Sequence, residues 1–218
     1  MISIVILTYN RLAALKQCLE SIKKYTSCVY EIIVVDNAST DGTTGYLNKC
    51  NYINKHICNT SNEGVCARNY GFNAARYPII CQIDDDVVVH QLWDSIVINA
   101  MKDTNIGMCG VQGGIMKQLY DVQLGKTNYG CVDLLTGFFM AFRNIGIQYD
   151  KSFGAFWRED DDLCFQFKEK GYKIKLIPTV CTHLSQRREI DWNLHNKNTE
   201  HLIMKWKDKQ EILRLGGN

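Results

Sequence analysis

Three consecutive carboxylates, Asp84, Asp85 and Asp86, are the residues whose spacing most clearly implies chemistry. They follow the apolar segment 79–83 and precede the valines at 87–89. Like charges in contact repel by about 1 kcal/mol in water, and by several times that in a partly desolvated pocket. The triplet therefore indicates either an open, solvated turn or a site that binds a cation. The apolar flanks favour a hard divalent cation, which carboxylates hold well.

Two other polar clusters also follow apolar segments. The segment 8–11 (TYNR) follows the first apolar run, and the segment 37–43 (NASTDGT) follows a run that ends at Asp36. In parallel sheets, ligands bind beyond the carboxyl ends of the strands. We therefore expect these two clusters and the acidic triplet to converge on one edge of a sheet.

The elements that must position these clusters alternate between strand and helix. Apolar runs predict strands at 2–9, 31–36 and 78–84, and the segment 53–58 is a candidate for a further strand. Helices are predicted after Asn10, which can serve as a cap, from 43 to about 50, and over 62–76. This order predicts an α/β fold with a mostly parallel sheet flanked by helices.

The second half of the chain is less regular. Strands are predicted over 107–115, 131–143 and 173–185, the last carrying His183 near its end. Helices are predicted over 157–172, opened by acidic residues, and over 199–215. The last helix has a core-packing or partner-docking face, and any membrane contact through it is expected to be peripheral.

Composition narrows the classes of protein. A chain of 218 residues with a net charge of +2 suits one soluble domain and argues against a dedicated nucleic-acid binder. Its ten cysteines are scattered without a C-x-x-C pair, which makes a zinc ribbon or redox motif improbable and suggests a reducing, cytoplasmic location. No segment reaches transmembrane length.

In this order the motifs resemble the family 2-type glycosyltransferases of the GT-A fold, which is Rossmann-like. The matching pieces are VILTYNR, VVDNASTDGT, NEGVCARNYG, IDDD, LLTGFFMAFR, FWREDDDLCFQFKEKGYKI and THLS. The resemblance implies a single GT-A catalytic domain over 1–218. Residues 1–90 would form the nucleotide-sugar-binding half and 107–218 the acceptor-binding and catalytic half. The chain is then either a minimal enzyme or one domain of a longer protein. A homo-oligomeric state is also compatible with the resemblance.

The resemblance also implies transfer of a sugar from a nucleotide-sugar donor to an acceptor hydroxyl, usually with Mn²⁺ or Mg²⁺. Asp84 and Asp86 match the outer positions of the family's D-x-D signature. Asp84 would face the ribose or base, and Asp86 would ligate the metal. Asp85 is grouped with the donor-binding residues, and His183 matches a histidine that completes the metal site in many relatives.

Further donor-side positions follow from the same resemblance. They are Thr8, Tyr9, Arg11, Asp36 and Arg68. Asp36 could instead form an ordinary turn with Asn37 and Ser39. Arg68 could instead form a surface ion pair.

The general base is expected among the acids at 159–162. In the family's pattern the second acid, Asp160, takes the proton of the attacking hydroxyl. Glu159 and Asp161 remain alternatives, because the register could slip by one residue, and Asp162 is expected to be structural. Acidic residues at a helix start are also favoured by the helix dipole alone.

Acceptor recognition is less defined. Thr136 and Gly137 match acceptor-side positions, and Trp157 could stack on a sugar ring or simply pack. The loop 116–130 matches no motif. A glycan, a glycolipid or a glycoprotein all fit as acceptors.

Two other functions compete with the transferase. One is a sugar-1-phosphate nucleotidyltransferase, against which TYNRLAAL counts, because a Gly-rich basic loop is expected there. The other is a non-catalytic nucleotide-sugar-binding module. Among donors, the Asp36 pattern and the rhamnosyltransferase-like segment EDDDLCFQFKEKGYKI favour UDP- or dTDP-sugars.

Overall fold

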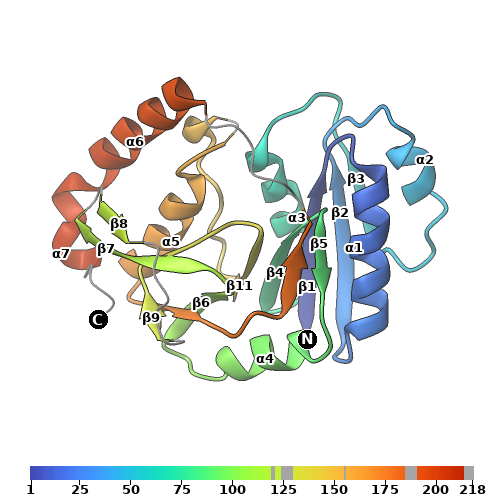
Figure 1. Cartoon of the computed structure of the whole chain (residues 1–218), viewed down its shortest axis with the longest axis horizontal. Helices are drawn as coiled ribbons and strands as arrows, with labels where there is room; N and C mark the ends of the chain where they lie inside the picture. Colours follow the sequence, from blue (N-terminus) through green and yellow to red (C-terminus); the bar gives the residue numbers. More distant parts are fainter. Residues whose placement is uncertain (119–120, 124–129, 155, 185–190, 214–218) are drawn as a thin grey trace.

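An eight-stranded mixed sheet forms the centre of the computed structural model, which describes residues 1–118, 121–123, 130–154, 156–184 and 191–213 (Figure 1). Across the sheet the strands are β3 (Lys55–Cys58), β2 (Tyr30–Asp36), β1 (Ile2–Thr8), β4 (Ile79–Asp84), β11 (Phe139–Arg143), β6 (Ile106–Gly110), β12 (Lys173–Leu176) and β9 (Cys131–Val132). Strands β3, β2, β1 and β4 are parallel, whereas β11 runs antiparallel to both of its neighbours. The predicted mostly parallel α/β sheet is confirmed.

The register of the parallel strands aligns the polar clusters. Thr8 lies opposite Asp36, and Leu7 lies opposite Asp84. Successive residues of β1 are buried on opposite faces of the sheet, so Val5 and Ile6 belong to different core clusters. Burial on both faces explains why these strands read as continuous apolar runs.

Helices cover both faces of this sheet (Figure 1). On one face, α1 (Leu12–Tyr25) buries Leu15, Leu19 and Ile22. On the other, α3 (Arg68–Ala74) follows the 3₁₀ turn η1 (Val65–Ala67) and packs so closely that a Cβ on Gly71 would lie 2.4 Å from Val5 Cγ1. The shorter helices are α2 (Thr43–Leu47) and α4 (Trp93–Ala100).

The expected helix cap at Asn10 is wrong. The residue that precedes α1 is Arg11, and the backbone N–H of Leu12 is capped by Asp41 at 2.9 Å. Asn10 has a φ of 52° and accepts a hydrogen bond from the backbone N–H of Thr40. Its side chain therefore joins the first two polar loops.

The three long strands predicted in the second half are each broken between sheets. Segment 107–115 divides into β6 and β7 (Gly113–Gln118), and segment 131–143 divides into β9, β10 (Leu134–Leu135) and β11. Segment 173–185 divides into β12 and β13 (Cys181–His183). A three-stranded sheet contains β10, β7 and β8 (Asp121–Gln123), and β13 pairs with β5 (Val87–Val89). Apolar composition is the same whichever sheet a residue joins, so it did not reveal the breaks.

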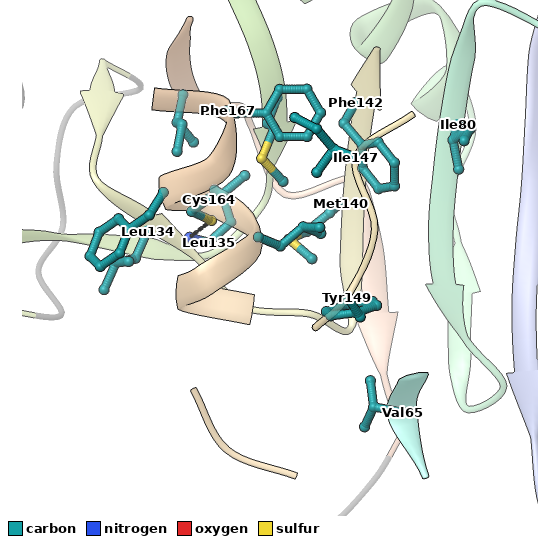
Figure 2. Packing of buried hydrophobic residues seen from close by; sticks show 14 of the residues in the cluster. Val65, Ile80, Leu134, Leu135, Met140, Phe142, Ile147, Tyr149, Cys164 and Phe167 are labelled. Carbon is teal, nitrogen blue, oxygen red and sulfur yellow. Dashed lines mark hydrogen bonds between the residues drawn. The ribbon is translucent and has the colours of Figure 1, made fainter. Parts of the chain in front are cut away.

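The second half of the chain packs around α5 (Glu159–Glu169), which follows the 3₁₀ turn η2 (Lys151–Phe153). Cys164 of α5 accepts the backbone N–H of Leu135 at 3.3 Å, within a cluster that also holds Met140, Tyr149 and Phe167 (Figure 2). The buried aromatic and apolar side chains in this cluster fix the position of α5 against the central sheet.

The last helical segment begins earlier than predicted. It comprises α6 (Trp192–Trp206), η3 (Lys207–Lys209) and α7 (Gln210–Leu213). Asp191 caps α6 by accepting the backbone N–H groups of Asn193 and Leu194, a signal that the apolar pattern alone did not display. The helix buries Leu202 and Trp206, as expected of a core-packing face.

Parts of the sequence predictions lie outside the described residues. These are most of the unassigned loop 116–130, Ser185 of the THLS motif, and the end of the last predicted helix at 214–215. Among the described residues, no helix has the length and apolarity needed to cross a membrane.

Candidate functional site

Two carboxylates and an imidazole meet at the end of β4. One ligand atom from each of Asp84, Asp86 and His183 lies within 4.8 Å of the others. The register of β5 against β13 places Val87 opposite His183, which brings the histidine to the acidic turn across 97 residues of sequence. The Nε2 atom of His183 lies 3.1 Å from Oδ1 of Asp86. The sequence-predicted ligands Asp86 and His183 are thus brought together.

The chemistry of this cluster suits a divalent metal. Carboxylate oxygens and an imidazole nitrogen are ordinary ligands of such ions, and His183 of β13 joins two carboxylates that stand two residues apart at the end of β4. The hydrogen bond to Asp86 raises the pKa of His183. The ring of Phe138 stacks on that of His183 with centroids 4.7 Å apart, which fixes its orientation.

Arg11 provides positive charge beside the triplet. Its Nη1 atom lies 2.6 Å from Oδ2 of Asp86 and 3.1 Å from Oδ1 of Asp85. Thr8 donates a 2.8 Å hydrogen bond to the other oxygen of Asp85. Asp85 is buried, and burial raises its pKa while Thr8 and Arg11 oppose the rise. Thr8 therefore holds Asp85, which together with Asp86 holds Arg11. The part of Thr8, Arg11 and Asp85 in donor binding stays a prediction.

Arg68 is buried rather than on the surface, so the alternative of a surface ion pair is wrong. Its guanidinium pairs with Asp84, and its Nε atom has no hydrogen-bond partner among the described residues. Burial alone would lower the pKa of Arg68, but Asp84, Asp160 and Glu159 around it raise it. The arginine therefore stays charged between the acidic triplet and the acids of α5.

Asp36 lies at the carboxyl end of β2, next to the first loop. It is buried, and its two oxygens accept the backbone N–H of Ser39 at 2.9 Å and the hydroxyl of Thr44 at 2.6 Å. The turn with Ser39 that was open as an alternative is therefore present. Tyr9 is 44% exposed on the same edge, where its ring is accessible to a ligand.

Asp160 is held by two hydrogen bonds. The backbone N–H of Gly137 donates to Oδ2, and the hydroxyl of Tyr149 to Oδ1, each at 2.8 Å. Burial raises the pKa of Asp160 to about 6, although the bond from Tyr149 and the charge of Arg68 act in the opposite direction. A carboxylate with such a pKa is mostly ionised at neutral pH and can accept a proton.

The neighbouring acids differ from Asp160 in their surroundings. Glu159 is buried, and burial together with Asp160 raises its pKa well above the usual range. Asp161 pairs with Arg158 at 2.9 Å. Asp162 is fully buried and accepts the indole N–H of Trp206 at 2.8 Å, as a structural residue would.

Sequence reasoning missed Tyr149. Its hydroxyl lies 2.8 Å from both Asp160 Oδ1 and Gln82 Oε1, and the residue is buried. It stands in the irregular segment between β11 and η2, outside every motif, so no pattern in the sequence marks it. Tyr149 orients the carboxylate of Asp160, which lies on a different element, α5.

The residues expected on the acceptor side differ in their contacts. Gly137 contacts the candidate base, whereas Thr136 bonds to the carbonyl of Gln112. Trp157 has a φ of 76°, its carbonyl accepts from Asn198, and its ring lies 6.0 Å from that of His195. Trp157 therefore packs against α6.

Comparisons with known proteins agree with this arrangement. The chain is 27% identical over 133 residues to glycosyltransferase AglE of Haloferax volcanii, an alignment that covers 55% of this chain and 44% of that protein. Its fold matches the crystal structure of GalNAc-T7 with UDP, GalNAc and Mn²⁺ with a TM-score of 0.78 at 18% identity, over 97% of this chain and 49% of the other. It also matches the mannosyltransferase PcManGT from Pyrobaculum calidifontis, in complex with GDP-Man and Mn²⁺, with a TM-score of 0.72 at 18% identity. That match covers 96% of this chain and 64% of the other.

The chain thus spans about half the length of the first two of these proteins. At such identities the solved structures establish the fold alone, which is the GT-A fold. The sequence model described as "Glycosyl transferase family 2" matches residues 3–194, which include the acidic triplet, the acids of α5 and His183. The chain belongs to glycosyl transferase family 2, as the resemblance of its motifs predicted.

Proposed function

We propose that this glycosyltransferase is metal-dependent and inverting, and that it moves a sugar from a UDP- or dTDP-sugar to a hydroxyl of a glycan, glycolipid or glycoprotein. One observation carries the proposal. The buried Arg68 pairs with Asp84 of the cluster that Asp84, Asp86 and His183 form, and it also interacts electrostatically with the buried carboxylate of Asp160. A base and a cation site are thus arranged around one charged centre.

The metal would be held by Asp86 and His183, with Asp84 within reach. A bound Mn²⁺ or Mg²⁺ would neutralise the charge of the nucleoside diphosphate that leaves. The chain's own residues complete this environment, because Arg11 and Arg68 supply positive charge next to the same acids. Metal dependence is supported by this donor set, and by the Mn²⁺ in the structures of GalNAc-T7 and PcManGT.

The nucleoside would lie along the ends of β1 and β2. Asp36 can accept the ring N–H of uracil or thymine, and the exposed ring of Tyr9 offers an apolar surface to the base. The structure of GalNAc-T7 contains UDP and that of PcManGT contains GDP-Man, so these neighbours do not choose between bases. The pattern around Asp36 is our reason for favouring a pyrimidine.

Asp160 would act as the general base. It would accept the proton of the acceptor hydroxyl while the oxygen attacks the anomeric carbon, and the bond to the diphosphate would break on the opposite face. General bases of this kind typically contribute 10²- to 10⁴-fold to the rate. Gly137 and Tyr149 would keep the carboxylate oriented during this step.

The test is nucleotide release from a panel of UDP-, dTDP- and GDP-sugars, with Mn²⁺ and then with EDTA. Wild type, Asp160→Asn and Asp161→Asn would be compared, the last being a matched change on the same helix. The proposal expects metal-dependent release from a UDP- or dTDP-sugar that is lost only in Asp160→Asn. Equal loss in both variants would contradict the assignment of the base, and unchanged release in EDTA would contradict metal dependence. Release from GDP-sugars alone would contradict the proposed donor.

A further inference from the structure

A second cluster of metal-ligating side chains lies at the carboxyl ends of β2 and β3. Asp36, His56 and Cys58 each place one ligand atom within 4.8 Å of the other two. The register pairs Asp36 with Cys58, and His56 stands two residues before Cys58, so all three point to one face of the sheet. The Nε2 atom of His56 lies 3.1 Å from Cys58 Sγ and 4.0 Å from Asp36 Oδ2.

The surroundings orient two of these groups as ligands. The Nδ1 atom of His56 lies 3.3 Å from the side-chain oxygen of Asn48, which can only accept, so the tautomer with its proton on Nδ1 satisfies this contact. In that tautomer Nε2 is free to ligate, and it is the ring nitrogen nearer to Cys58 Sγ, at 3.1 Å against 3.8 Å for Nδ1. Asp36 is itself held by Ser39 and Thr44. Outer hydrogen bonds of this kind, to a ligating histidine and to a ligating carboxylate, are characteristic of protein metal sites.

We propose that Asp36, His56 and Cys58 form a second cation site, specific for a thiophilic divalent ion such as Zn²⁺ or Cd²⁺. A thiolate, an imidazole and a carboxylate are the ligands that Zn²⁺ prefers, and three protein ligands leave one position for solvent. Cys58 is exposed, so an ion can reach the site from solution. As the sulfur–metal bond forms, the thiol proton passes to solvent.

This site differs in chemistry from the cluster at the acidic triplet. That cluster contains carboxylates and an imidazole but no sulfur, which suits a harder ion such as Mn²⁺ or Mg²⁺. The two clusters therefore have different metal preferences. They also share no residue, so each can be removed separately by substitution.

Occupancy of the second site would act on the donor. This consequence rests on the proposed function, in which Asp36 binds the nucleoside. An ion that ligates Asp36 withdraws the carboxylate from the base, so Zn²⁺ and the nucleotide would compete. The enzyme would then be inhibited by thiophilic ions at one site while it is activated by Mn²⁺ at the other.

The first experiment is a Cd²⁺ titration of the reduced full chain in the presence of saturating Mn²⁺. Thiolate-to-cadmium charge-transfer absorption in the near ultraviolet reports only on sites that contain sulfur. We expect a band that saturates at one Cd²⁺ per chain, disappears in Cys58→Ser and requires at least about tenfold more Cd²⁺ in His56→Gln. Cys131→Ser, a change at a half-buried cysteine on β9, should retain the band. Absence of the band, or an equal band in Cys58→Ser, would overturn the proposal.

The second experiment measures UDP binding with Mn²⁺, with and without Zn²⁺, in wild type and in Cys58→Ser. Competition predicts weaker UDP binding with Zn²⁺ in wild type and no change in the variant. If UDP does not bind wild type at all, the proposed donor is wrong, while the Cd²⁺ band still decides the metal site. If UDP binds equally with and without Zn²⁺ in wild type, competition is overturned.

Discussion

The backbone N–H of Gly137 donates a 2.8 Å hydrogen bond to Oδ2 of Asp160. The approach is so close that a Cβ at residue 137 would lie 2.3 Å from both carboxylate oxygens. Only glycine leaves room for the carboxylate in this position. The loop before β11 thus sets the position of the candidate base on α5.

Gly137→Ala is expected to displace Asp160 and lower kcat by at least about tenfold, because the carboxylate must move away from the new methyl group. Steady-state rates and Mn²⁺-dependent donor binding would be measured together, with binding expected to persist. Gly45→Ala is the matched control, since a Cβ there meets nothing within 4 Å. Full activity in Gly137→Ala would show that the position of Asp160 is unimportant.

Asp160→Asn is expected to lower kcat by about 10²- to 10⁴-fold, because an amide cannot accept the hydroxyl proton. Donor affinity should change little, since Asp160 contacts Gly137 and Tyr149 rather than the acidic triplet. Single-turnover rates and donor titrations separate the two quantities. A variant that loses donor affinity but keeps its turnover rate would argue for a binding role instead.

The pH dependence of kcat/KM should report on the same carboxylate. Burial raises the pKa of Asp160 to about 6, and the base works only when ionised. Activity should therefore be low at acidic pH, rise through about pH 6 and level off above it.

Tyr149→Phe is expected to move the acidic limb of the pH–rate profile, where activity rises, to higher pH. The hydroxyl of Tyr149 lowers the pKa of Asp160 by donating to its ionised form, so its removal raises the pKa. Complete pH–rate profiles of both proteins would be compared. A variant with a lower plateau but an unshifted limb would indicate a packing effect, since Tyr149 also stacks on Phe72.

Asp162→Ala should destabilise the fold by about 2–3 kcal/mol, because the buried indole N–H of Trp206 loses its acceptor. For a chain of this size that corresponds to a fall in Tm of roughly 5–10 °C. Glu169→Ala is the control on the same helix, where an exposed pair with Lys209 contributes little. Thermal unfolding with equal falls in both variants would contradict a structural role specific to Asp162.

His183→Ala is expected to weaken Mn²⁺ binding by at least about tenfold, because a ligand of the proposed site is removed. Calorimetric titration with Mn²⁺ would measure the change. His90→Ala is the control, since His90 directly follows β5 and contacts Thr182 of β13 rather than the acidic triplet. Equal affinity in His183→Ala and wild type would exclude the histidine as a ligand.

Three strands in the first half of the fold were predictable, because they are buried on both faces of the sheet. The predicted strands 2–9, 31–36 and 78–84 correspond to β1, β2 and β4 within one residue at each end. The second half was not, since segments 131–143 and 173–185 each cross from one sheet to another. Which sheet a residue joins depends on partners far along the chain.

The sequence by itself determined the family and showed which parallel strands end in polar clusters. It also determined the chemical types of the candidate ligands and base. These follow from local patterns, such as an apolar run that ends in carboxylates. Only the tertiary structure decided the pairing of Arg68 with Asp84, the contact of Tyr149 with Asp160, and the meeting of His56, Cys58 and Asp36. Each of these depends on side chains from separate segments meeting at hydrogen-bonding or ligand distance, which strand register and packing set and local sequence does not encode.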